Sequence, residues 1–251
     1  MIIHKFNKPI IGTVINRPSK TNKSPYLADV LINGKIYMAH SPSLGLSGLI
    51  KSGSLVFVEE NLNPDNVSKF KIVTVKIKEF ETNNKFIYVG ANPVLVNQLF
   101  LNCLKFNLLS FKNIIEIKKE VTIFGSRIDF ELIGKNNKKY LIECKYAPTV
   151  DYHPDHKQIK NVSVGNKNNY KRAAIFPDGW QYKKGAVVSE RAMKHLKSLI
   201  TARKKGFKCF LFFFCLREDV EYFRPNYEKD IIFTNKIKQA KKTVLLLKLL
   251  N

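Results

Sequence analysis

The residues best suited to chemistry lie in the segment SRIDFELIGKNNKKYLIECK, which runs from residue 126 to residue 145. This pattern predicts two strands joined by a turn centred on Asn136, and side chains alternate between the two faces of a strand. Asp129 and Glu143 each lie seven positions from that centre. A hairpin would therefore place them directly opposite each other, with their Cβ atoms roughly 4.5–5.5 Å apart. Lys145 would point to the same side as Glu143.

Two carboxylates held this close repel each other unless a cation lies between them. We expect Mg²⁺ or Mn²⁺ here, bound by the side chains of Asp129 and Glu143 and by the backbone carbonyl of Cys144. Such an ion polarises a phosphodiester and lowers the pKa of its bound water, while Lys145 positions that water or neutralises developing charge. The spacing thus predicts phosphodiester hydrolysis with Asp129, Glu143 and Lys145 as catalytic residues. An exposed hairpin face with an ordinary ion pair is the alternative interpretation.

The first 90 residues are rich in β-branched and aromatic residues separated by Gly, Pro, Asn and Ser, which is typical of short strands. Asn33 and Gly34 form a strong hairpin-turn signal between two of them. Five or six short strands predict a small closed all-β barrel over residues 1–90. The expected strands are Ile10–Ile15, Tyr26–Ile32, Lys35–His40, Leu55–Glu60, Lys69–Phe80 and Lys85–Gly90.

Residues 91–251 have a different pattern. Asn92 is a suitable N-cap and Pro93 a suitable first helical residue, so we expect a buried helix over 93–109. Residues 147–174 are polar and predict a long exposed loop. Helices and strands that follow one another in this way predict an α/β domain over 91–251. Its other expected elements are strands Ile114–Phe124, Arg127–Ile133, Lys139–Tyr146, Phe207–Leu216 and Val244–Leu249, and helices Ser189–Lys205 and Asp230–Lys242.

The chain of 251 residues is strongly basic, with 43 basic and 20 acidic residues, a net charge of +23 and a pI near 9.8. Such a field attracts polyanions, so DNA or RNA is the expected partner and binding should weaken with salt. An anionic membrane surface is the alternative. Tyr26 and His40 would stack on bases or, alternatively, pack in the barrel core. The other candidate nucleic-acid contacts are Arg127, Arg191, Lys194 and His195. Arg127 could instead pair with a carboxylate, and His195 could instead pack under its helix.

The cysteine content and the apolar runs indicate the cellular compartment. The four cysteines include no CxxC pair, which argues against a zinc site or a disulfide framework. The N-terminus shows no long apolar stretch, and the most apolar run, 209–216, is too short to cross a bilayer. We therefore expect a cytoplasmic protein in a reducing compartment, with no membrane partner and no small-molecule cofactor.

The order of several short motifs indicates a family. SRIDFEL, YLIECK, IFPD, SERAMKHL, GFKCFLFFF and VEYFRP follow YLADV, AHSPSLGLSGLIKSGSLVFV and GANP. Between about residues 10 and 245 the chain resembles the sugar fermentation stimulation protein A (SfsA) family. The resemblance implies an OB-type barrel followed by a restriction-endonuclease-like domain of the PD-(D/E)xK class that acts on DNA or RNA. In that class Asp129, Glu143 and Lys145 match the metal-binding and catalytic motif, and Asp178 and Glu190 match possible supporting positions.

Two departures from the family pattern leave two hypotheses open. Met193 stands where the family usually has Gln, and the helix over 93–109 lacks the acid that this nuclease class often supplies. The first hypothesis is a metal-dependent nuclease with an OB-type binding domain. The second is a nucleic-acid-binding protein whose nuclease-like domain does not cut. A transcriptional regulator of sugar metabolism, suggested by the family's name, is a form of the second.

Overall fold

The computed structural model describes the chain except residues 45, 79–85, 151–171, 178–188, 241–243 and 249–251. The first part is a six-stranded sheet in the order β3-β2-β1-β4-β5-β6. Parallel pairing of Ala39 with Phe70 and of His40 with Lys71 joins β3 to β5 and closes the sheet into a barrel. The strands are β1 Ile10–Asn16, β2 Leu27–Ile32, β3 Lys35–His40, β4 Leu55–Glu60, β5 Phe70–Lys78 and β6 Phe86–Gly90.

The barrel forms because inward-facing apolar residues alternate with outward-facing residues along its strands. Val14, Val30, Val56 and Val75 are fully buried in one apolar cluster inside it. Asn33 and Gly34 have φ angles of 47° and 78°, the left-handed values that a two-residue hairpin turn requires. The expected strand order of the first 90 residues is therefore confirmed, although Tyr26 lies just before β2 rather than within it.

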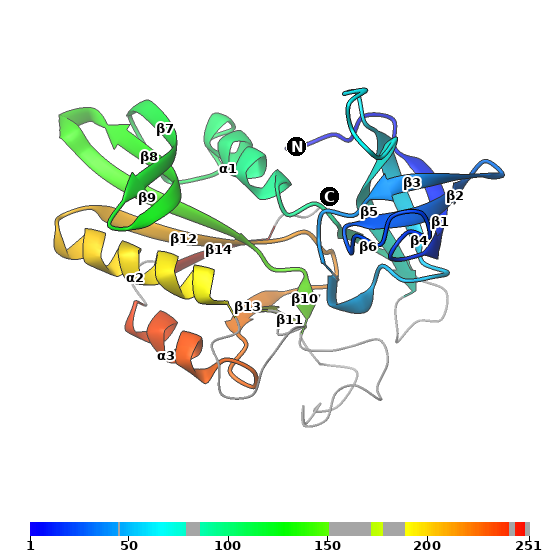
Figure 1. Cartoon of the computed structure of the whole chain (residues 1–251). Helices are drawn as coiled ribbons and strands as arrows, with labels where there is room; N and C mark the ends of the chain where they lie inside the picture. The colour runs from blue at the N-terminus through cyan, green and yellow to red at the C-terminus, as the bar shows by residue number, and fades with distance from the viewer. Residues whose placement is uncertain (45, 79–85, 151–171, 178–188, 241–243, 249–251) are drawn as a thin grey trace.

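The second part is built on a five-stranded sheet in the order β14-β12-β9-β8-β7. Helix α1 covers one face, and α2 and α3 cover the other (Figure 1). In β12 the side chains of Phe212 and Phe214 pack on the α1 side and that of Phe213 on the α2 side, which explains its continuously apolar sequence. The elements are β7 Ile114–Ile123, β8 Ser126–Gly134, β9 Lys138–Tyr146, β12 Lys208–Cys215, β14 Val244–Lys248, α1 Leu95–Lys105, α2 Glu190–Lys204 and α3 Ile231–Gln239, with short 3₁₀ turns η1 Leu46–Gly48 and η2 Lys135–Asn137.

Side-chain caps set the starts of two helices. Ser189 accepts a hydrogen bond from the backbone N–H of Ala192 at the start of α2, and Asp230 accepts one from Phe233 at the start of α3. Asn92 accepts from the N–H of Val94, and α1 begins only at Leu95. The helix expected from residue 93 is therefore shorter at both ends. None of the described helices is long and apolar enough to cross a bilayer.

The expected exposed loop over 147–174 is wrong at both of its ends. A third sheet in the order β10-β11-β13 is formed by Thr149–Val150, Ala173–Phe176 and Tyr222–Pro225. Ala147, Thr149 and Ala174 are buried. Strands of two to four residues are too short to show a period, which is why the sequence pattern missed them. Residues 151–171 lie outside the described part.

The barrel is joined to the second part through Gly90 and the residues after β12. The N–H of Gly90 donates to the carbonyl of Leu216 at 2.8 Å, and Val89 forms a β-bridge with Arg217. A Cβ atom at Gly90 would lie 2.7 Å from Cβ of Leu216, so only glycine fits this approach. The hydroxyl of Tyr146 also donates to the carbonyl of Gly90.

Asp219 holds this junction together electrostatically. Arg217 is almost fully buried and donates to both carboxylate oxygens of Asp219 at 2.8 and 2.9 Å and to the carbonyl of Pro148 at 3.0 Å. Arg172 donates to the same carboxylate at 3.1 Å. Burial raises the pKa of Asp219, but hydrogen bonds from Arg217 and the charges of both arginines outweigh it and hold the pKa below its usual value.

Asp219→Asn should lower the free energy of unfolding by about 3–5 kcal/mol at neutral pH, because it leaves the buried arginine charge uncompensated. Since the folded-state pKa is depressed, this stabilisation is present above the unfolded-state pKa and is lost as the pH falls through the folded-state value. Urea denaturation at several pH values measures both effects. Glu116→Gln, which removes one half of an exposed pair with Lys118, is the control. Equal losses in the two variants would contradict a stabilising role for Asp219.

Candidate functional site

The β8–β9 hairpin brings the candidate catalytic residues together. Its antiparallel ladder runs from Gly134 opposite Lys138 to Phe130 opposite Ile142. This is the register expected for a turn centred on Asn136, and η2 occupies that turn. In β9 the side chains of Ile142 and Cys144 pack on the α1 side and those of Glu143 and Lys145 on the α2 side, as the alternation predicted.

Strand β8 is irregular where Asp129 lies. Ile128 packs in the cluster on the α2 side, whereas Phe130 packs in the cluster on the α1 side. Regular alternation along the strand predicts that these two residues share one face, and this prediction is therefore wrong. The ladder with β7 pairs Lys119 with Phe130 and Val121 with Ile128, and Glu120 between them has a left-handed φ of 53°. Asp129 thus lies at a break in the alternation, beyond the last residue pair of the β8–β9 ladder.

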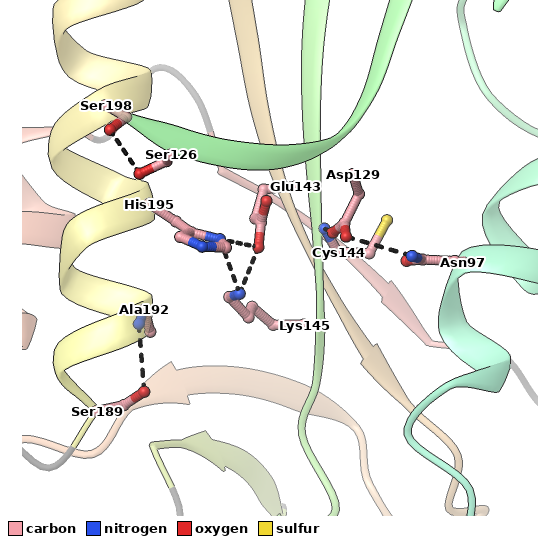
Figure 2. A network of polar contacts seen from close by, with 10 residues as sticks. All are labelled: Asn97, Ser126, Asp129, Glu143, Cys144, Lys145, Ser189, Ala192, His195 and Ser198. Atoms are coloured by element: carbon pink, nitrogen blue, oxygen red, sulfur yellow. Dashed lines mark hydrogen bonds and ion pairs between the residues drawn. The ribbon is translucent and has the colours of Figure 1, made fainter. Parts of the chain in front are cut away.

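The Asp129 carboxylate turns toward α1. Its Oδ2 accepts a hydrogen bond from the backbone N–H of Cys144 at 2.7 Å, and its Oδ1 accepts one from the side chain of Asn97 at 3.2 Å (Figure 2). Burial raises the pKa of Asp129, and the negative charge of Glu143 raises it further. The two acids are therefore close enough to repel each other, but their side chains approach different helices.

Glu143 is buried beneath α2. Its Oε1 accepts hydrogen bonds from Nζ of Lys145 and from Nδ1 of His195, and these two nitrogens lie 3.4 Å apart (Figure 2). Burial raises the pKa of Glu143, but the hydrogen bond from His195 and the charge of Lys145 outweigh it, so the pKa lies below its usual value. Among the described residues no group hydrogen-bonds its buried Oε2. One carboxylate oxygen thus accepts two hydrogen bonds, and the other is buried without a hydrogen-bond partner among the described residues.

Helix α2 is held in register with the sheet by two serines. The hydroxyl of Ser198 lies 2.8 Å from that of Ser126 on β8 and donates to the carbonyl of Phe124 at 2.8 Å. Met193 is buried in the apolar cluster beneath α2. These contacts fix the height of α2 over β9 and so place His195 against Glu143.

The predicted contact residues on β8 and α2 differ in their environment. Arg127 is exposed and pairs with Glu120 at 3.7 Å, so its carboxylate-pairing alternative is realised. Glu190, Arg191 and Lys194 are exposed at the start of α2. His195 on the same helix is buried, which matches its expected alternative of packing under the helix, but it also bonds Glu143.

The barrel residues lie apart from this network. Tyr26 is 41% exposed and His40 is partly buried at the β3–β5 closure. Burial, and then the charge of Lys71, lowers the pKa of His40. Asp178 lies outside the described residues. In the described part of the chain, no three His, Cys, Asp or Glu side chains are arranged so that together they could hold a metal ion.

One residue at the site, Asn97, was missed by the sequence reasoning, and the bond of the candidate residue His195 to Glu143 was not foreseen. The helix over 93–109 was noted only for its lack of an acid, yet its Asn97 is the α1 residue that reaches Asp129. His195 lies three residues after Ala192 and one before Leu196, both buried, so helical spacing already placed it on the buried face. A polar residue on the buried side of each helix was the available signal.

Asp129→Asn should stabilise the protein by about 0.5–2 kcal/mol at neutral pH, because it removes the repulsion with Glu143. An amide at 129 still accepts from Cys144, and the Asn97 amide can rotate to accept its second bond. The folded-state pKa of Asp129 is raised. The wild type therefore loses folding stability as the pH rises through the unfolded-state pKa and then the folded-state pKa of this group. Thermal unfolding between pH 3 and 8, a range chosen to span roughly both values, measures this difference.

Asp29→Asn is the matched control, and its expected effect on stability is opposite to that of Asp129→Asn. Burial raises the pKa of Asp29, but hydrogen bonds from Lys20, Ser19 and Asn16 outweigh it and lower the pKa. This substitution should therefore destabilise the protein at neutral pH. Destabilisation by both substitutions would show that Asp129 has a structural role like that of Asp29.

The comparisons with known proteins agree on one family. Residues 158–249 match the family described as "Sugar fermentation stimulation protein RE domain". A sugar fermentation stimulation protein homolog of Pelagibacter ubique is 31% identical over 224 residues, 88% of this chain and 80% of the relative. One from Clostridium beijerinckii is 28% identical over 94% of this chain and 87% of the relative. The structure of SfsA from Pyrococcus furiosus in complex with Ca²⁺ matches with a TM-score of 0.73 at 17% identity, covering 99% of this chain and 91% of that one. The chain therefore belongs to the sugar fermentation stimulation protein (SfsA) family.

Proposed function

We propose that this protein is a nuclease that hydrolyses DNA or RNA with Mg²⁺ or Mn²⁺, built from an OB-type barrel over 1–90 and a restriction-endonuclease-like domain over 91–251. The observation that carries the proposal is the free, buried Oε2 of Glu143, close to a second carboxylate and next to a lysine on the same strand. An unpartnered buried carboxylate oxygen is costly unless a ligand satisfies it.

The residues fit a hard divalent ion with few protein ligands. Mg²⁺ commonly takes one or two carboxylates and completes its shell with water and substrate phosphates. Asp129 and Glu143 would supply the carboxylates, and the carbonyl of Cys144 between them a third oxygen. The raised pKa of Asp129 indicates negative charge that is not fully compensated, which a cation would relieve. The Pyrococcus furiosus relative was solved with Ca²⁺, another oxygen-seeking ion.

Each residue of the network has a distinct part in the proposed reaction. The metal, when bound, supplies Lewis-acid polarisation of the phosphodiester. The side chain of Lys145 keeps 15% of its surface exposed, so its amine can donate to a phosphate oxygen or to the attacking water. The N–H of His195 fixes the orientation of Glu143. The exposed Arg191 and Lys194 on α2 supply charge that holds the polyanion.

The cellular setting follows from the thiols. All four cysteines are buried and unpaired, which suits a cytoplasmic, reducing compartment.

Asp129→Ala and Lys145→Ala should each abolish EDTA-sensitive cleavage, by about 10²–10³-fold for loss of a transition-state contact, and leave nucleic-acid binding largely intact. Labelled single- and double-stranded DNA and RNA are incubated with Mg²⁺, Mn²⁺ or EDTA, and binding is measured separately in EDTA. Lys238→Ala, on the exposed side of α3, is the control for loss of one positive charge. Loss of binding in parallel with cleavage would contradict the catalytic roles.

The residues that α1 and α2 place at the site favour a second function. This helix reaches Asp129 through the amide of Asn97, not through an acid, and Met193 under α2 is apolar. A protein that binds nucleic acid without cutting it would have this composition. Binding without cleavage in any metal supports it, and selective retention of one promoter fragment over competitor DNA would indicate a transcriptional regulator.

Asn97→Asp tests the second function directly. A third carboxylate beside Asp129 should raise the affinity for Mn²⁺ at least tenfold and lower the stability of the metal-free protein, because like charges then meet without a cation. Isothermal titration and thermal unfolding in EDTA measure the two effects. Asn102→Asp, one turn and a half further along α1, is the control. An unchanged Mn²⁺ affinity in Asn97→Asp would argue against any metal site at Asp129.

A further inference from the structure

A second polar site lies at the turn end of the β8–β9 hairpin. A partly open cavity of about 250 Å³ lies between η2 and the loop that joins α1 to β7. Gly134 and Lys138 of this hairpin lie five residues along the strands from Asp129 and Glu143, respectively. At about 3.3 Å per residue that separation is roughly 16 Å. The cavity is therefore distinct from the candidate catalytic site. It is lined by Ser110, Lys112, Asn113, Lys135, Lys138 and Tyr140.

The walls of this cavity are fixed by the fold. The N–H of Lys135 donates to the carbonyl of Asn113 at 3.0 Å, which ties the loop to the turn. Asn113 has a left-handed φ of 58°. The ring of Tyr140 packs edge-on against Phe111 with a centroid distance of 5.5 Å. A Cβ atom at Gly134 would lie 3.4 Å from the Tyr140 ring, so the backbone and the ring already touch closely. The cavity is thus a formed feature of the turn.

Three lysines at this cavity have no carboxylate partner among the described residues. In the part of the chain that the structure describes, no carboxylate lies within ion-pair distance of Lys112, Lys135 or Lys138. The hydroxyl of Ser110 and the amide of Asn113 add neutral hydrogen-bonding groups. Like charges gathered around one concavity repel each other, so an anion bound there lowers the electrostatic energy.

We infer that this cavity binds a phosphate group of a nucleic-acid backbone. Ammonium groups are point charges suited to phosphate oxygens, and the volume is below the roughly 300–1,000 Å³ typical of pockets for larger organic ligands. The link to nucleic acid rests on the proposed function. A separation of roughly 16 Å corresponds to about five base-pair steps of rise along the axis of a duplex. The cavity therefore extends the substrate footprint away from the candidate catalytic site.

The experiment compares two triple variants with the same net charge. Lys112→Ala/Lys135→Ala/Lys138→Ala removes the cavity lysines, and Lys35→Ala/Lys119→Ala/Lys238→Ala removes three exposed lysines from β3, β7 and α3. We call the first triple variant the cavity variant and the second the scattered variant. Circular dichroism verifies that both are folded. If the cavity variant does not fold, the single variant Lys112→Glu replaces it in the same measurements. Thermal shift with inorganic phosphate and oligonucleotide binding in EDTA over a salt series are the two measurements.

Phosphate should raise the melting temperature of the wild type and of the scattered variant, but not that of the cavity variant. The cavity variant should also lose about two to three from the salt-dependence slope of oligonucleotide binding, more than the scattered variant loses. Equal responses of both variants to phosphate would overturn the site. Selective loss of phosphate binding with equal oligonucleotide binding would overturn its assignment to nucleic acid. The oligonucleotide-binding measurements are made in EDTA, so absence of cleavage in the separate assay with Mg²⁺ and Mn²⁺ would overturn the proposed nuclease and leave this result unchanged.

Discussion

Burial of the Glu143 carboxylate between β9 and α2 is the interaction on which the arrangement of the second sheet depends. Removing an ionised carboxylate from water costs several kcal/mol unless its hydrogen bonds are replaced. One donor, Lys145, comes from the same strand, but the other, His195, comes from α2. The helix must therefore lie at one height over the sheet. Its N-cap at Ser189 and its contact with β8 through Ser198 make that height the stable one.

Two of the buried carboxylate networks in the described part of the chain, those of Asp219 and of Glu143 with Asp129, differ in a way that indicates which one is functional. Two arginines satisfy Asp219, which lies between them with a lowered pKa, so this network stabilises the junction with the barrel. Asp129 has a raised pKa, and Glu143 keeps an oxygen without a partner. Perturbed acids with incomplete compensation concentrate at ligand and catalytic sites, whereas structural ion pairs are saturated. The polar network around Glu143 is therefore the better candidate for chemistry.

Local pattern predicted much of the fold because its elements have clear periods and ends. The helix starts at Ser189 and near Asp230, and the alternation of Glu143 and Lys145 with their apolar neighbours, follow from adjacent residues alone. The break at Asp129 was not predictable in this way. It depends on the left-handed residue Glu120 in the neighbouring strand, and nothing in the β8 sequence shows it. The contact from Asn97 likewise depends on how α1 packs on the sheet.

The composition predicts a large positive net charge but does not show where on the molecule the charge lies. Several basic side chains are partly compensated within the molecule: Lys71 pairs with Glu59 and Arg127 with Glu120, at 3.6 and 3.7 Å. The pair of Arg127 is exposed and therefore weak, and a polyanion competes with Glu120 for the same cation. A lysine without a carboxylate partner can bind a phosphate without first breaking an ion pair. The basic groups that matter for a polyanion are therefore those the fold leaves unpaired, and only the packing of loops and turns decides which these are.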